Sequence, residues 1–573
     1  MTMHECRTDP ARRPRHAPDS RCRGAPAGGG TRLPHYGCAV TARPRRRRTA
    51  GLVTLVFAAL ASHAMIAPAA GQVGTVTFAN SGAAAAQPAF LEGLALLHNF
   101  EYGRAARAFR EAQRIDPDFA MAYCGEAMTY NHGLWFEQDS AAARAVLERL
   151  APTRQARRAK AKTQREQEWL DAVEALYGEG SKPARDTAYA RAMQRLHETR
   201  PADPEAAAFY ALSLLGTAHG GRHIPTYMRA AAIVEETFRD HPGHPGAAHY
   251  LIHAYDDPVH APLGMRAARA YAVIAPDAGH AQHMTSHIFV AMGMWADVVK
   301  ANENATHVVD AQRAAAGQPA SACGHYNYWL EYGYLMQGRT ADAKRLLTEC
   351  RDRAVGNPDA GHASHAIDPD NTLIGSLIQM RTRFLLDTDD WTGDVAGWEL
   401  PATLAPAMRI SVAFTEGYAA FRRDDVAAAR TALDALARTR QALTPAMRSP
   451  ADAFVVRAAI LEQELTGIVA IMERRGDDAV RVLREAARAE EVMPFEFGPP
   501  FIDKPTDELL GDLLMRLGRA AEAAVAYEAA LARAPQRVPA LRGLAAAADA
   551  AGNSARAGEA RRSIAAIRDN GGR

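Results

Sequence analysis

The feature that most constrains this chain is a repeated helix–turn–helix pattern. In residues 90–128, FLEGLALLHNFEYGRAARAFREAQRIDPDFAMAYCGEAM, a first helix carries Gly93 at a small position and a turn follows at 101–103. A second helix then carries Phe109, and Asp116-Pro117 separates it from a third helix. Small residues at fixed positions let helices approach closely, so this pattern predicts helical hairpins that stack on their neighbours.

A second copy of the pattern lies near the C-terminus, in residues 508–552. There Gly511 takes the small position, Tyr527 lies in the second helix and Pro535 ends the unit. This is the tetratricopeptide (TPR) pattern of about 34 residues per repeat. Weaker copies start near Pro204, His280, Tyr326, Ile410 and Arg457.

The repeats predict an all-α fold, a right-handed α-solenoid of TPR-like helical hairpins with a concave groove. No stretch alternates apolar and polar residues between turn signals, so no sheet is expected. We expect an N-terminal TPR solenoid over residues 78–350, which holds a His-rich groove, and a C-terminal solenoid over 370–570 that continues the superhelix.

The first 69 residues carry export features. Residues 41–69 combine a basic run, an apolar core and the small-residue pattern Ala67-Pro68-Ala69, which predicts a cleaved signal peptide and no transmembrane anchor afterwards. Residues 1–40 form a basic leader without periodicity, for which we expect disorder, and the sequence leaves open whether they are translated. The protein is therefore expected to be exported, to the periplasm or the medium.

Charge argues against a nucleic-acid partner. The whole chain carries a net charge of +2, but residues 1–48 hold twelve Arg and three acids, and subtracting their +9 leaves −7 for the rest. An acidic body offers no overall basic surface to phosphates, so we expect no nucleic acid and favour a protein or peptide partner.

Three cysteines remain after the leader: Cys124, Cys323 and Cys350. Three thiols in about 500 residues exclude a disulfide framework. One bridge between Cys323 and Cys350 is open, although the sequence favours small buried thiols.

Five sequence blocks resemble a family of secreted bacterial TPR proteins: NSG before the first repeat, LLHNFEY within it, HYLIHAYDDPVHAPLG, an HMxSHIF helix, and FGPPF followed by ELLG. The resemblance covers about Phe78 to Gly552. It implies the TPR fold and export, and it supplies no catalytic roles. This chain departs from the family at Cys124, where Trp is common, and at Thr285, where Pro is common.

Histidines cluster in one part of the chain, since 12 of the 21 lie between His219 and His325. His249 and His253 are four residues apart and share one helix face. His280, His283 and His287 form a second stripe on the next expected groove-lining helix. The two stripes are expected to face each other and to bring their ring nitrogens near one common point.

Such facing imidazoles suit a divalent transition metal, namely zinc, copper or iron. The sequence predicts His249, His253, His283, His287 and Asp257 as metal ligands, with Asp256, His260, His280 and His325 as further candidates that complete or orient the site. The competing interpretation is structural: the histidines bond to acids and backbone carbonyls, and Asp257 caps the helix that follows Pro258.

Two functions follow. The first is an exported TPR scaffold that binds a protein or peptide partner in its groove. The second is a metal-dependent enzyme, a hydrolase or an oxidase, whose acid or base would be Asp256, Asp257 or Glu331. HYLIH lacks the Glu of the H-E-x-x-H metalloproteases, and no G-x-S-x-G elbow or P-loop is present.

Overall fold

The computed structural model describes residues 72–356, 372–401, 404–443, 453–493 and 498–571. The described residues all belong to one compact unit, which begins at Pro68. The predicted leader (1–40) and signal peptide (41–69) lie outside the described residues.

Helices make up almost all of the regular structure. Up to residue 356 they are α1 (Gln87–His98), α2 (Tyr102–Ile115), α3 (Ala120–Met128), α4 (Ser140–Leu150), α5 (Arg154–Lys160), α6 (Gln164–Leu176), α7 (Lys182–Thr199), α8 (Pro204–Leu215), α9 (Ile224–Asp240), α10 (Pro245–Tyr255), α11 (Ala261–Ile274), α12 (Gly279–Ala291), α13 (Trp295–Ala315), α14 (His325–Gln337) and α15 (Thr340–Gly356).

The later helices are α16 (Leu373–Thr388), α17 (Pro406–Arg422), α18 (Val426–Gln441), α19 (Ala453–Met472), α20 (Gly476–Glu491), α21 (Thr506–Arg516), α22 (Ala520–Arg533), α23 (Val538–Ala550) and α24 (Ser554–Gly571). Short 3-10 turns are η1 (Ala84–Ala86), η2 (Gly133–Trp135) and η5 (Asp394–Gly397). Among the described residues no helix combines the length and the apolar run that crossing a bilayer requires.

The repeat pattern acts through one aromatic side chain held between two glycines. A Cβ on Gly93 of α1 would lie 2.9 Å from the Phe109 ring of α2, and one on Gly125 of α3 would lie 2.4 Å from it. Tyr527 of α22 is enclosed in the same way, 2.7 Å and 2.3 Å from the Cβ positions of Gly511 and Gly543. Only glycine fits where a ring fills the space of a side chain.

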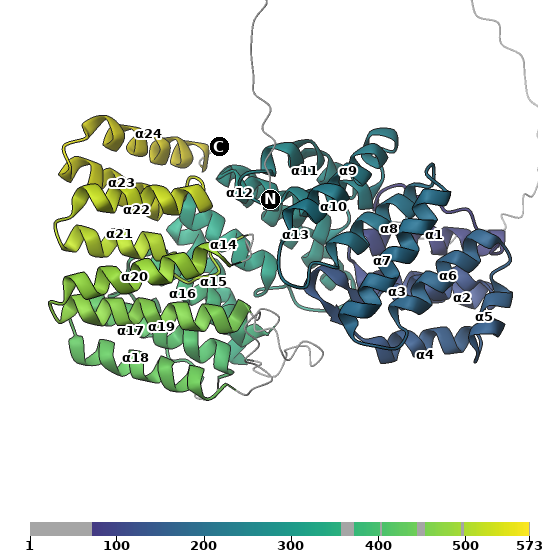
Figure 1. Cartoon of the computed structure of the whole chain (residues 1–573), viewed down its shortest axis with the longest axis horizontal. Helices are drawn as coiled ribbons and strands as arrows, with labels where there is room; N and C mark the ends of the chain where they lie inside the picture. Colours follow the sequence, from purple (N-terminus) through teal and green to yellow (C-terminus); the bar gives the residue numbers. More distant parts are fainter. Residues whose placement is uncertain (1–71, 357–371, 402–403, 444–452, 494–497, 572–573) are drawn as a thin grey trace, which may run out of the picture. The chain divides into compact units, whose positions relative to one another are not determined.

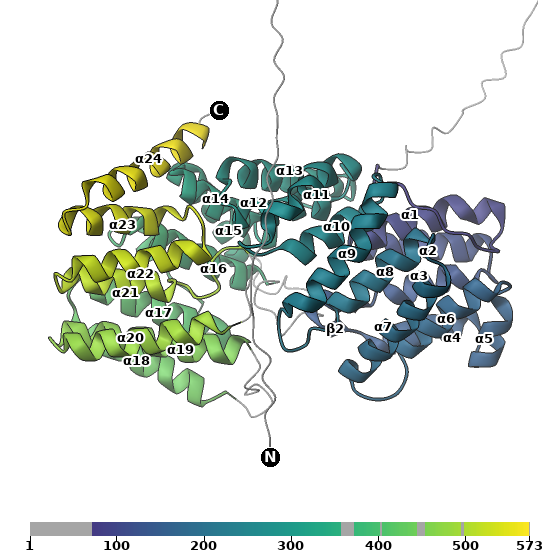
Figure 2. The same cartoon turned by 45° about the horizontal axis from the view of Figure 1, so that its top comes forward.

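Successive helices pack in chain order. Each of α1 to α3 and α5 to α23 contacts the helix that follows it, as in the stack from α20 to α24 in Figures 1 and 2. This confirms the predicted fold class, a right-handed α-solenoid of TPR-like hairpins. One hydrophobic core runs along the solenoid from Val73 to Ile567.

The expectation of no sheet is wrong in one detail. Strands β1 (Asn131–His132) and β2 (Glu137–Gln138) pair antiparallel across η2. Phe136, in the left-handed region at φ 56°, closes this short turn. The ladder is local and leaves the helical architecture unchanged.

Cys323 and Cys350 form a disulfide, with Cα atoms 4.8 Å apart. The bridge that the sequence left open is therefore present, in place of the favoured buried thiols. The bridge connects two places in the chain: Cys323, two residues before α14 begins, and Cys350 in α15. Cys124 stays a buried free thiol.

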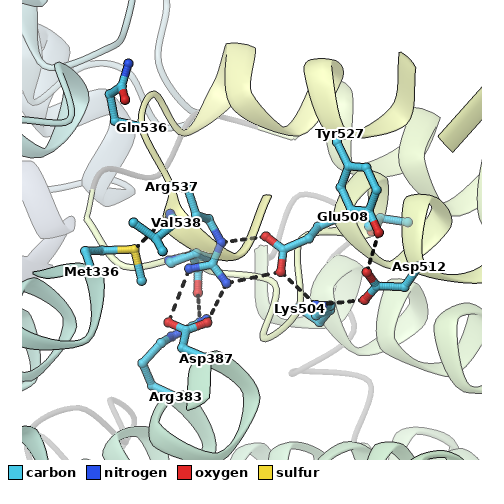
Figure 3. A network of polar contacts seen from close by, with 12 residues as sticks. Met336, Arg383, Asp387, Lys504, Glu508, Asp512, Tyr527, Gln536, Arg537 and Val538 are labelled. Atoms are coloured by element: carbon cyan, nitrogen blue, oxygen red, sulfur yellow. Dashed lines mark hydrogen bonds and ion pairs between the residues drawn. The ribbon is translucent and has the colours of Figure 1, made fainter. Parts of the chain in front are cut away.

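A buried ionic network ties the C-terminal repeats to α16. Figure 3 shows Arg537 between two acids: its Nε donates to Glu508 at 2.8 Å and its Nη2 donates to Asp387 at 2.5 Å. Lys504 extends the network from Glu508 to Asp512. Arg537 is completely buried, so these carboxylates supply the compensation that a buried guanidinium requires.

Candidate metal centre

Helices α10 and α12 place the predicted histidines in the interior. The side chain of His244 caps α10 by accepting a hydrogen bond from Ala247 N at 3.1 Å, and Pro245 occupies the first turn. All residues of α10 and all but one of α12 are buried, because α11 covers one side and α8 and α13 pack against the two helices. The histidine stripes thus lie on helices with no solvent face.

The first triad consists of His249, His253 and His280. The Nε2 atom of His249 lies 3.1 Å from Nε2 of His253 and 3.2 Å from Nε2 of His280. Three ring nitrogens from α10 and α12 thus lie within 4.8 Å of one another, close enough to hold one metal ion.

The second triad consists of His283, His287 and His325. The Nε2 atom of His283 lies 3.1 Å from Nε2 of His287 and 3.1 Å from Nε2 of His325. Here α12 supplies two ligands and the first residue of α14 supplies the third. His325 is the most exposed of the six histidines.

Hydrogen bonds at the far side of the rings fix the tautomers in the second triad. Asn302 donates its Nδ2 to Val298 O at 2.9 Å, so its Oδ1 faces His283 Nδ1 at 2.7 Å and accepts the ring hydrogen. The carboxylate of Asp256 accepts the Nδ1 hydrogen of His287 at 2.6 Å. In the neutral rings the facing Nε2 atoms of both therefore present lone pairs.

Two lone pairs 3.1 Å apart do not hydrogen-bond to each other. A cation between them satisfies both, and the carboxylate and amide behind the rings are the second-sphere partners that metal-bound histidines use. The second triad therefore has the donor set and the orientation of a metal site.

In the first triad, one ring is oriented in the same way, by an acceptor behind its Nδ1 atom. His249 donates its Nδ1 hydrogen to the backbone oxygen of His98 at 2.7 Å, so its Nε2 lone pair points at His253 and His280. The three nitrogens converge on a point next to that lone pair, as a tris-imidazole site requires.

Burial keeps the rings neutral. It lowers the pKa of His249, His253, His280 and His283 well below 6.5, and neighbouring imidazoles lower each of these pKa values further. Neutral imidazole is the form that binds metal, so no proton has to leave these rings at neutral pH.

The two triads are neighbours. The rings of His253 and His287 have centroids 5.9 Å apart, and those of His280 and His283 are 6.2 Å apart. Aromatic side chains enclose both triads: Phe100 contacts His249 at 4.3 Å, and Trp329 stacks on His287 at 4.5 Å. The low polarity of these walls strengthens electrostatic interactions inside.

The structure brings together six of the predicted residues, but not around one point. His280 and His325 were only further candidates in the sequence analysis. In the structure His280 completes the triad of His249 and His253, and His325 completes that of His283 and His287. Asp256 lies behind His287 as an orienting group.

Asp257 and His260 join neither triad. Asp257 accepts from Arg222 at 2.9 Å and from the backbone of Val259 and His260, so it stabilises the turn before α11. It does not cap that helix, as the structural interpretation expected, because α11 begins at Ala261 with His260 in the N-cap position. The ring of His260 bonds back to Asp257.

A third cluster, His98, Glu205 and His244, was missed by sequence reasoning. Glu205 accepts from His98 at 2.7 Å and from His244 at 3.2 Å, while Tyr250 OH lies 2.8 Å from the other nitrogen of His98. Donors and acceptors match throughout, so hydrogen bonds alone satisfy this cluster. Its signal in the sequence is weak, since the three residues belong to three separate helical segments.

A cavity of about 80 Å³ lies against the second triad. Its wall includes His287 and Asp256 on one side and residues 498–505, between α20 and α21, on the other. The described part of the segment MPFEFGPPFIDKPTDELLG thus contributes to a cavity wall. Residues 494–497 lie outside the described residues.

Comparisons with known proteins add no family. No protein-family model matches the chain, and no curated protein matches it. Solved structures to which the chain is similar include the human IFIT1 dimer with m7Gppp-AAAA (11% identical over 86% of this chain and 91% of that chain, TM-score 0.34). Yeast Tom70 is 10% identical over 81% of this chain and 88% of that chain, with a TM-score of 0.31. The TPR domain of P58(IPK) is 12% identical over 82% of this chain and 99% of that chain, with a TM-score of 0.22.

TPR-repeat proteins are thus among the structures similar to this chain. The helices and their packing order establish the fold, and at these identities and TM-scores no function passes from those proteins to this one. The resemblance to a secreted family stays a prediction.

Proposed function

We propose that this chain is an exported helical-repeat metalloprotein that binds one transition metal ion at each histidine triad. The observation that carries the proposal is the 3.1 Å approach of Nε2 of His287 to Nε2 of His283, two nitrogens turned toward each other because each ring donates its Nδ1 hydrogen to an acceptor behind it. Six imidazole nitrogens with no thiolate and no carboxylate in the inner set favour zinc, copper or iron.

The disulfide supports the export part of the proposal. Bridges such as Cys323–Cys350 persist in oxidising compartments, namely the periplasm and the medium, and are rare in the cytosol. The predicted signal peptide at 41–69 gives a route to that compartment.

Metal titration tests the proposal. The mature protein, depleted of metal with a chelator, is titrated with Co²⁺ and Zn²⁺, and two equivalents are expected to bind. His249→Ala should lose the equivalent of the first triad and His283→Ala that of the second, because each removes the central ligand of its triad.

His260→Ala is the matched control, since this histidine lies in the same region but in neither triad. It should keep both equivalents. A wild-type protein that binds no metal, or variants that lose helicity but no metal, would contradict the proposal.

Binding of a protein or peptide partner is a second candidate. A cavity of about 450 Å³ on α16 and α17 supports it, with Trp391, Trp398 and Leu400 in its wall beside Arg423. Ala419 also lines this cavity, so Ala419→Trp should abolish binding of peptides selected from a displayed random library, while Ala427→Trp on exposed α18 should not. Selection of no peptide, or equal binding by both variants, would rule this role out.

A metal-dependent reaction, hydrolytic or oxidative, is the remaining candidate. Three protein ligands leave a coordination position open to water or substrate, and the cavity at His287 supports access to it. Of the three candidate acids or bases, Asp256 lines this cavity, and Asp257 and Glu331 do not. Turnover of ester or phenol substrates that needs metal and is lost in His287→Ala would establish the reaction, and equal turnover without metal would exclude it.

A further inference from the structure

The cavity beside the second triad is enclosed by segments far apart in the sequence. The end of α12 and the start of α13 form one side, and the end of α20, residues 498–505 and α22 form the other. Contacts outside the cavity hold this second side in place: Arg383 donates to Pro500 O at 3.0 Å and Arg457 donates to Phe501 O at 2.8 Å. The cavity is therefore part of the folded architecture.

Most of the wall is apolar. Val290, Trp295, Met493, Phe501 and Ile502 line it. Walls of this kind bury the hydrocarbon part of a ligand, at roughly 25 cal/mol for each Å² removed from water. The occupant thus needs an apolar body.

The polar groups of the wall are mostly acidic. Asp256, Glu490 and Asp507 line the cavity, and Arg533 is the cation that faces them. Asp256 is completely buried; its Oδ2 accepts from His287, and its Oδ1 has no hydrogen-bond partner among the described residues. A buried carboxylate oxygen without a donor is costly, so a donor from a ligand would be stabilising.

Glu490 and Asp507 repel each other. Burial and the charge of Glu490 together raise the pKa of Asp507 to about 6, against the opposing charge of Arg533. Burial also raises the pKa of Glu490, whose carboxylate accepts from Thr506 N at 2.8 Å. A cation bound between these carboxyls relieves the repulsion.

We propose that this cavity binds a small molecule with an apolar body and a protonated amino group, and that the amino group donates to Asp256 and the carboxyls opposite it. An anion would face three acids and one guanidinium. A neutral, purely apolar molecule would leave Asp256 Oδ1 without a donor. An ammonium group supplies three donors and the opposite charge.

The inference goes beyond metal binding and does not depend on it. The amine and the metal occupy different places, since the cavity touches the second triad through His287 and the other two ligands do not line it. Binding is therefore measured on the metal-depleted and the metal-loaded protein. If the protein binds no metal, the amine titration still tests the cavity. If it binds no amine, the metal titration still tests the triads.

The test uses 2-phenylethylamine as the probe, with 2-phenylethanol and 3-phenylpropanoate as neutral and anionic counterparts of similar size, in calorimetric titrations of the mature protein. The amine should bind about tenfold or more tightly than either counterpart, because it alone forms charge-assisted hydrogen bonds to the acids. Asp256→Asn and Asp507→Asn should each weaken amine binding about tenfold and leave 2-phenylethanol nearly unchanged.

Asp434→Asn, on exposed α18 far from the cavity wall, is the matched control and should bind the amine like the wild type.

The pH dependence of amine binding to the wild type is a second measurement, which needs no variant. As Asp507 ionises beside Glu490, Glu491 and Arg533, amine affinity should rise with pH through about 6. Equal binding of the three probes, or amine binding that neither variant weakens, would overturn the proposal.

Discussion

At the residue scale, the position of a ring hydrogen separates a metal ligand from a hydrogen-bonded core histidine. Asn302 and Asp256 hold the Nδ1 hydrogens of His283 and His287, so both Nε2 lone pairs point inward. In the cluster around Glu205 the other ring nitrogens meet donors instead, Tyr250 OH at His98 Nδ1 and Ala247 N at His244 Nδ1. The surroundings of each ring thus decide its role, not the presence of histidine alone.

Replacing Asn302 tests the orienting role directly. Asn302→Ala removes the acceptor behind His283, so the metal affinity of the second triad should fall by about 10–100-fold while the first triad is unchanged. Asn304→Ala, on an exposed face of the same helix, is the control and should leave both affinities unchanged. Competition against a chelator of known affinity measures the difference. Equal affinity in Asn302→Ala and wild type would show that the contact does not orient the ligand.

Glu331 gives a pH dependence with a definite sign. It is fully buried, neither carboxylate oxygen has a hydrogen-bond partner among the described residues, and burial raises its pKa well above 4.5 although Arg383 opposes the shift. Between 4.5 and the raised pKa the folded chain binds one more proton than the unfolded chain. The contribution of Glu331 to stability therefore falls as pH rises, by up to about 1.4 kcal/mol per pH unit.

Glu331→Gln cannot ionise, so its melting temperature relative to wild type should rise between about pH 5 and about pH 8. Glu148→Gln, at an exposed position of α4, should show no such trend. A constant difference between Glu331→Gln and wild type would mean that this carboxyl titrates normally.

At the element scale, spacing predicted which faces carry the histidines, since residues three and four apart share a helix face. The grouping into two triads was not predictable from spacing. It depends on how far α12 is rotated against α10 and α14, which places His280 beside His249 and His283 beside His325. That rotation is set by the packing of side chains around the helices, which one-dimensional periodicity does not contain.

The disulfide joins α15 to the chain beside the second triad, because Cys323 lies two residues before His325 at the start of α14. Its sequence separation of 27 corresponds to a loss of about 3.5 kcal/mol in the free energy of unfolding when the bridge is removed. Cys323→Ser combined with Cys350→Ser should lower the melting temperature and weaken metal binding at the second triad more than at the first. Equal weakening at both triads would separate the bridge from the site.

At the scale of the whole molecule, the repeats sufficed to predict the fold class, because each hairpin contacts mainly its neighbours. The cavity at His287 could not be predicted. Its two sides come from residues 256–332 on one hand and from 490–493 and 498–534 on the other, and their approach depends on contacts such as the hydrogen bond from Trp295 Nε1 to Gln536 O at 2.9 Å. No local pattern encodes a contact of that sequence separation.

The predicted export also concerns the whole chain. The N-terminal sequence of the protein recovered from periplasm or medium should begin near Ala69 or Ala70, because the small-residue pattern that ends the apolar run is the expected cleavage site. An exported protein that retains residues 41–60 would contradict cleavage.

The central claim, one metal ion in each triad, is tested most directly by anomalous diffraction from crystals of the metal-loaded protein, recorded on both sides of the absorption edge of the metal. Two peaks are expected: one about 2.0–2.1 Å from Nε2 of His249, His253 and His280, and one at the same distance from Nε2 of His283, His287 and His325. Map density that leaves both triads without an anomalous peak at saturating metal would contradict the account.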